Sequence, residues 1–110
     1  MSRKLISLST VSFLMVSTAI ADVPVVTVDI APVHSLVSRV IQGLGNAHLV
    51  IPPNASPHHY SLRPSEAESL QKADLIFWMG EDLTPWMENA LKSLSSDAEI
   101  VTLLEQSETQ

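Results

Sequence analysis

The apolar residues of this chain alternate between strand-like and helix-like spacing, and this alternation strongly limits the possible folds. Strand-like runs cover residues 25–28, 48–51, 74–79 and 99–103. Helix-like segments begin at Pro32, at Pro64 or Ser65, and at Asp82 or Thr84. Strands and helices that alternate with short connections favour a parallel sheet with helices on both faces. The sequence therefore predicts an α/β fold with the order β-α-β-α-β-α-β.

The helical segments carry apolar stripes and recognisable end signals. The first stripe consists of Val33, Leu36, Val37, Val40, Ile41 and Leu44. The last consists of Leu83, Trp86, Met87, Ala90, Leu91 and Leu94, with Pro85 in the first turn. Gly43 and Gly45 should end the first helix. Ser65 and Glu68 have the spacing of a capping box at the start of the middle helix, which should end near Lys72.

Residues 1–21 predict a secretory signal peptide. Arg3 and Lys4 precede a largely apolar stretch, and Ala19–Ile20–Ala21 has the small residues of a cleavage site. The stretch is interrupted by Ser and Thr and is shorter than the ~20 apolar residues that span a bilayer. We therefore favour export over a membrane anchor, and expect residues 22–110 to form one domain that does not insert into the membrane after cleavage.

The charge of the predicted mature chain excludes several classes of partner. From Asp22 onward, four Lys and Arg stand against twelve Asp and Glu, a net charge of −8. An acidic surface disfavours nucleic acid and anionic membranes. The absence of cysteine excludes disulfides, thiolate metal ligands and a lipid-bearing cysteine at the cleavage site. We expect a free protein in the periplasm.

The run from Pro52 to Tyr60 is the best candidate for a ligand site. It follows a predicted strand, and α/β sheets bind ligands beyond the carboxyl ends of their strands. The run contains His58 and His59, and imidazole is a good ligand for Zn(II). Neighbouring side chains in an extended loop point in different directions, so we expect only one of the two to reach a given ion. An ordinary polar loop is the alternative.

The other polar and aromatic residues favour structural roles. His34 is expected to be partly exposed near a helix start, and His48 to have a surface or partly buried structural role. Trp78 and Trp86 are expected in the core, and the carboxylates Glu66, Glu68 and Glu81 as helix-start and surface charges. The patterns HExxH, HxH and GxSxG are absent, as is a Gly-rich phosphate loop. A secreted metallohydrolase would need a second ligand cluster, so we predict that the chain is not an enzyme.

Two segments resemble a known family. Residues 54–66 read Asn-Ala-Ser-Pro-His-His-Tyr-Ser-Leu-Arg-Pro-Ser-Glu, and residues 70–76 read Leu-Gln-Lys-Ala-Asp-Leu-Ile. A His-x-Tyr after a Pro-containing loop, then Pro-Ser-Glu and Ala-Asp-Leu, is similar to the metal-binding solute receptors of ABC importers. The resemblance is to the periplasmic zinc receptor of the ZnuA type, and it extends roughly from Val25 to Leu104.

The resemblance implies roles for three residues. His58 corresponds to the family's first metal ligand, and His59 occupies the variable position and is a secondary candidate. Tyr60 would orient the loop without binding the ion. Such receptors consist of two α/β lobes joined by a long helix, hold Zn²⁺ between the lobes as transported ligand, and deliver it as monomers to an ABC permease in the inner membrane.

The same resemblance implies that residues 22–110 are a truncated amino-terminal lobe. The remaining ligands would lie beyond residue 110, so zinc binding should be weak and apolar surface should be exposed. Two alternatives stay open: a manganese or iron receptor of the same family, and a non-functional truncated fragment.

Overall fold

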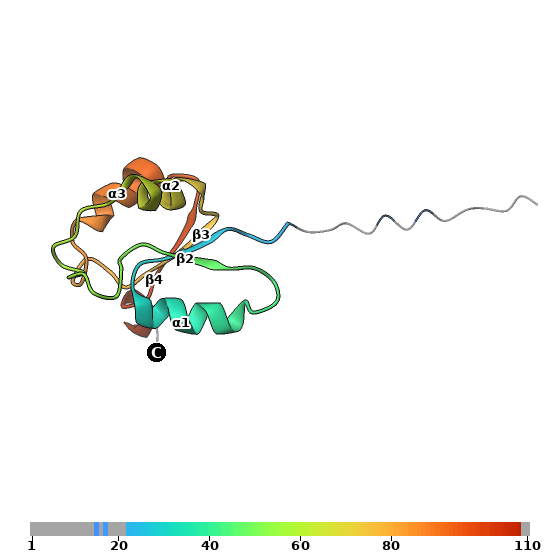
Figure 1. Cartoon of the computed structure of the whole chain (residues 1–110), viewed down its shortest axis with the longest axis horizontal. Helices are drawn as coiled ribbons and strands as arrows, with labels where there is room; N and C mark the ends of the chain where they lie inside the picture. Colours follow the sequence, from blue (N-terminus) through green and yellow to red (C-terminus); the bar gives the residue numbers. More distant parts are fainter. Residues whose placement is uncertain (1–14, 16, 18–21, 109–110) are drawn as a thin grey trace, which may run out of the picture.

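A computed structural model, which describes residues 15, 17 and 22–108, contains a parallel four-stranded sheet with helices on both faces (Figure 1). The strands are β1 (Val26–Val28), β2 (Ala47–Leu49), β3 (Leu75–Trp78) and β4 (Glu99–Thr102). Their order in the sheet is β2-β1-β3-β4. The predicted fold class and order of elements are confirmed. Of the predicted signal peptide, only residues 15 and 17 are described, so that prediction lies outside the described residues.

The register places all carboxyl strand ends at one edge of the sheet. Thr27 of β1 pairs with His48 of β2 on one side and with Ile76 of β3 on the other, in parallel in both cases. From β1 the chain moves outward to β2, whereas from β3 it moves outward to β4 in the opposite direction. The carboxyl ends of β1 and β3 therefore form the switch point at which open α/β sheets bind ligands.

The helices are distributed unequally over the two faces. Helix α1 (Ala31–Val40) covers one face, whereas α2 (Pro64–Lys72) and α3 (Met87–Leu94) lie together on the other (Figure 1). A 3-10 helix, η1 (Glu105–Glu108), follows β4. Among the described residues, no helix has the length and apolar character needed to cross a bilayer. The main core lies on the α2/α3 side and consists of Val50, Ile51, Leu70, Ala73, Ile76, Trp78, Met87 and Leu91.

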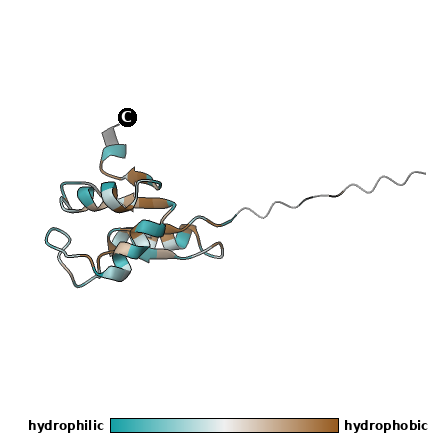
Figure 2. Cartoon of the chain, turned by 90° about the horizontal axis from the view of Figure 1, so that it is seen from above, coloured by the Kyte–Doolittle hydropathy of each residue, from teal (hydrophilic) through white to brown (hydrophobic). Residues whose placement is uncertain are grey.

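The α1 side is less well covered. Figure 2 shows the strands as strongly hydrophobic and the helices as mixed. Helix α1 has no buried residue, and Leu36 and Val40 are 65% and 82% exposed. Beneath it lies a hollow of about 380 Å³, lined by Pro24, Val26, Leu36, Val37, Val40, Ile41, Leu75 and Phe77. The expected exposure of apolar surface is therefore found on this side.

Several helix ends differ from the prediction. The end of helix α1 agrees with it: the helix ends at Val40, and the chain turns at Gly43, which has a φ of 84°. Helix α3 begins only at Met87, since the residues after β3 form turns rather than a first helical turn. The predicted capping box of Ser65 and Glu68 is wrong. The cap residue of α2 is Arg63, whose backbone N–H donates to the carboxylate of Glu66 at 2.7 Å.

One buried carboxylate joins the two strands at the switch point. Asp29 follows β1 and is fully buried. Its Oδ2 accepts the backbone N–H of Met79, just after β3, at 2.8 Å, and its Oδ1 accepts that of Ile30 at 2.7 Å. Burial raises the pKa of Asp29 above its ordinary value of 3.8, against the opposing effect of these backbone hydrogen bonds. Asp29 therefore fixes the spacing between the loops that follow β1 and β3.

We predict that Asp29→Ala destabilises the fold by roughly 2–4 kcal/mol. The substitution leaves the N–H groups of Ile30 and Met79 without their acceptor, and each unpaired buried donor costs about 1–3 kcal/mol. Urea unfolding followed by circular dichroism measures the change. Asp97→Ala, at an exposed position, is the matched control and should stay within about 0.5 kcal/mol of the unsubstituted chain. Equal midpoints for the two variants would contradict the role of Asp29.

Candidate metal centre

The histidine loop leaves the sheet at the predicted edge. After β2, the N–H groups of Val50 and Ile51 still donate to the carbonyls of Val28 and Asp29, both at 2.9 Å. The chain then leaves the sheet and returns at Pro64, the start of α2. His58 and His59 lie in a turn within this loop and are exposed to solvent. The predicted ligand His58 is therefore accessible at the carboxyl edge of the sheet.

A hydrogen bond from Trp86 fixes the loop before the histidines. The indole Nε1 of Trp86 donates to the carbonyl of Pro57 at 2.7 Å. Trp86 lies between β3 and α3, whereas Pro57 belongs to the loop after β2, and β1 lies between these two strands. The loop therefore reaches across the end of β1, over the switch point. Trp86 does pack against the core, as predicted, but its hydrogen bond could not be read from the sequence.

A second anchor follows the histidines. The hydroxyl of Tyr60 donates to Oε1 of Glu66 at 2.6 Å, and the second carboxylate oxygen accepts the Arg63 N–H. The ring of Tyr60 also lies against that of Trp86, with centroids 6.0 Å apart. Glu66 is only 9% exposed, so its assignment as a helix-start residue is right but its assignment as a surface charge is wrong. Its burial follows from its two partners, which satisfy both oxygens.

The two histidine rings contact each other. Nδ1 of His58 lies 3.3 Å from Nε2 of His59, and the rings meet edge to face with centroids 4.7 Å apart. The expectation that neighbouring rings point in different directions is therefore wrong. It assumed an extended loop, whereas residues 57–59 form a bend and a turn, which curls both side chains to one side. The turn offers two imidazole nitrogens at one place.

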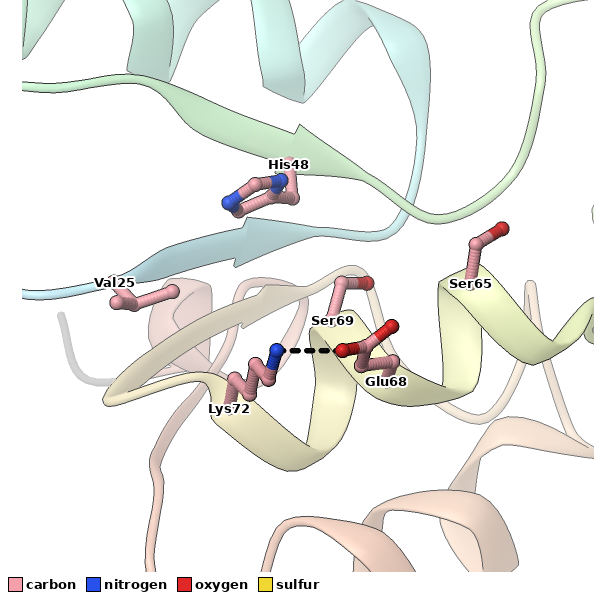
Figure 3. Close-up of a pocket in the computed structure, with 6 residues that line it drawn as sticks. All are labelled: Val25, His48, Ser65, Glu68, Ser69 and Lys72. Carbon is pink, nitrogen blue, oxygen red and sulfur yellow. Dashed lines mark hydrogen bonds and ion pairs between the residues drawn. The ribbon is translucent and has the colours of Figure 1, made fainter.

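The remaining histidines lie elsewhere. His34 is partly exposed near the start of α1, as predicted, and its Nε2 donates to the carbonyl of Ala47 at 2.9 Å. His48 is exposed and lines a pocket of about 400 Å³ between β2 and α2 (Figure 3). The same pocket contains Glu68 and Lys72, whose carboxylate and ammonium groups are 2.5 Å apart. Because the carboxylate of Glu68 is paired with Lys72, the imidazole of His48 is the remaining candidate metal ligand among the residues that line this pocket.

No larger ligand cluster occurs in the described part of the chain. Among residues 15, 17 and 22–108, no group of three or more His, Cys, Asp or Glu is placed to hold a metal ion. The centre therefore amounts to the His58–His59 turn and its two anchors. Structural zinc sites have four protein ligands, whereas two imidazoles leave positions for water or for further ligands.

The chain matches a protein family over most of its length. Residues 26–110 match the ZnuA family, described as the zinc-uptake complex component A, periplasmic. The high-affinity zinc uptake system protein ZnuA of Paracoccus denitrificans is 46% identical over 85 residues, which cover 77% of this chain and 26% of that protein. The protein of the same name from Brucella abortus is 40% identical over 78 residues, which cover 71% of this chain and 23% of that protein.

A solved structure shares the fold. The periplasmic zinc binding protein TroA from Treponema pallidum superposes with a TM-score of 0.68 at 27% identity, covering 74% of this chain and 30% of that one. The four-stranded parallel sheet and its flanking helices thus occur in a known periplasmic zinc binding protein. The chain spans about a quarter of the length of the ZnuA relatives it matches.

We predict that the phenol of Tyr60 titrates above its ordinary pKa. The hydrogen bond to Glu66 raises the pKa of Tyr60 above 10.0, because the adjacent carboxylate disfavours a phenolate. The folded chain then holds this proton more tightly than the unfolded chain. The interaction therefore stabilises the fold below about pH 10 and is lost as the pH rises through the folded-state pKa.

Tyr60 is the only tyrosine of the chain, so the ultraviolet absorbance of tyrosinate reports this group alone. Glu66→Gln should lower the midpoint of the titration toward the ordinary value. Glu68→Gln, on the exposed side of the same helix, should leave it unchanged. Identical midpoints in all three proteins would show that the Tyr60–Glu66 contact does not form in solution.

Proposed function

The chain belongs to the ZnuA family of periplasmic zinc-uptake components, and we propose that residues 22–110 are the amino-terminal lobe of a receptor that captures Zn(II) for import. The observation that carries this proposal is the exposed ring of His58, presented at the switch point by a loop anchored on both sides. A ring buried among apolar side chains could not reach an ion from solvent. Instead it faces solvent where α/β sheets bind their ligands.

Zinc fits the donor atoms of the turn better than the alternative ions. Imidazole nitrogen is a good ligand for Zn(II), whereas carboxylate and carbonyl oxygens suit manganese, magnesium and calcium. The turn carries two imidazoles, and the carboxylate that anchors the loop, Glu66, is already bonded to Tyr60 and Arg63. We therefore assign zinc as the transported ligand, and manganese or iron as the alternatives that a competition titration would detect.

The rest of the function concerns the receptor as a whole. Residues 1–21 direct export, and the protein acts in the periplasm as a monomer. It performs no catalysis and delivers its ion to an ABC permease of the inner membrane. Relatives that are named high-affinity zinc uptake system proteins support this role. A second lobe would supply the ligands that complete the coordination of the ion.

We predict that His58→Ala lowers the zinc affinity of the purified chain by about 10–100-fold. Loss of an outer-shell partner alone costs that factor at metal sites, and the loss of a direct ligand should cost no less. Isothermal titration with Zn(II) measures the change. His48→Ala is the matched control, because His48 is also exposed but lies on β2, away from the turn.

The outcome separates a receptor lobe from an inert fragment. A chain that binds Zn(II) with equal affinity before and after His58→Ala would contradict the proposed role of His58. No heat from any of the three proteins would favour a fragment without function. Circular dichroism of each variant verifies the fold, which should not change because the substituted side chains are exposed.

A further inference from the structure

We infer that His58 and His59 bind one Zn(II) ion together, as a two-imidazole chelate. This inference rests on the proposed function, since it concerns the same ion at the same loop. The family resemblance assigns a ligand role to the first histidine and leaves the second in a variable position. The structure adds the observation that Nδ1 of His58 and Nε2 of His59 lie side by side.

The distance between these nitrogens matches a zinc site. Zinc–nitrogen bonds of about 2.0–2.1 Å in tetrahedral geometry place two ligand nitrogens about 3.3–3.4 Å apart. The observed separation is 3.3 Å. The turn therefore already holds the nitrogens at the length of one edge of the tetrahedron. Binding requires both rings to rotate, so that their lone pairs point at a common ion and no longer along the line between the two nitrogens.

The backbone on either side of the pair is restrained. The carbonyl of Pro57 is bonded to Trp86, and the hydroxyl of Tyr60 is bonded to the buried Glu66. These contacts leave only His58 and His59 between two fixed points. A chelate formed from such a segment loses little backbone freedom on binding, which favours affinity. Both rings are exposed, so an ion can reach them directly from solvent.

The proton balance of the chelate is simple. Without an ion, one of the facing nitrogens donates a hydrogen to the other. A bound ion takes a lone pair from each, so the donor ring must move its proton to its other ring nitrogen. Two neutral rings therefore bind the ion without a net release of protons, by a change of tautomer in one ring. The other two positions of the ion are filled by water.

The chelate allows this lobe to bind Zn(II) before ligands from elsewhere in the receptor take part. Two imidazoles select borderline ions such as Zn(II) over Mg²⁺ and Ca²⁺, which prefer oxygen ligands. The ion is held on one side only, so its open positions stay available to ligands from elsewhere in the receptor. His59 thus acts as a second zinc ligand of the open lobe.

Titration of the purified chain with Zn(II) alone tests the chelate. His59→Ala should lower the affinity by about 10-fold or more, a loss similar to that of His58→Ala, whereas His48→Ala should change it less than twofold. X-ray absorption at the zinc edge supplies a second readout that folding defects do not mimic. It should count two imidazoles per zinc in the unsubstituted chain and one in His59→Ala.

The results distinguish failure of this inference from failure of the proposed function. Zinc affinity that falls in His58→Ala but not in His59→Ala, with one imidazole per zinc, would overturn the chelate and leave the role of His58 intact. Affinity that is unchanged in both variants would overturn both. Replacement of His59 by asparagine, which keeps a polar side chain on the turn, should behave like the alanine variant; full affinity in that variant would also overturn the chelate.

Discussion

The hydrogen bond from the Trp86 indole to the Pro57 carbonyl is the contact on which the geometry of the site depends. It connects the segment after β3 with the loop after β2, across the end of β1. Ala55, Tyr60 and Leu62 of the loop pack against the core, and this bond adds a fixed point directly before the histidines. The charge-assisted bond from Tyr60 to Glu66 restrains the other side of the turn. Each of these hydrogen bonds would contribute little in water. Here the rings of Tyr60 and Trp86 also pack against the core, so the two bonds hold the turn.

The sequence was sufficient to predict the framework of the fold. Buried parallel strands leave apolar runs bounded by turn residues, and all four runs became strands. The place of His58 followed from a rule about strand ends, and needed no knowledge of side-chain contacts. Helix ends were predicted less well. Arg63 and Glu66 have the same spacing as Ser65 and Glu68, but arginine has no side-chain oxygen to cap a helix, so the capping rule selected Ser65. In the structure the helix begins one residue before Ser65, at Pro64, and Glu66 accepts hydrogen bonds from the Arg63 N–H and the Tyr60 hydroxyl.

The histidine pair shows why side-chain geometry was beyond the sequence. Whether two adjacent rings diverge or converge depends on the backbone between them. An extended chain separates them, whereas the turn at residues 57–59 brings their nitrogens to 3.3 Å. That turn is imposed from outside, because the carbonyl of Pro57 is bonded to a residue 29 positions away in the sequence. Contacts of that range leave no periodic signal in the local sequence.

The two faces of the sheet have separate consequences for the site. Every anchor of the histidine turn comes from the α2/α3 side, through Glu66 of α2 and Trp86 before α3, and that side contains the closed core. The exposed apolar residues of α1 lie on the opposite face and contact neither anchor. The hydrogen bonds that hold the turn therefore do not involve the exposed apolar side chains of α1. The backbone on both sides of the His58–His59 turn, the zinc ligands that we propose, is therefore held by contacts within this chain.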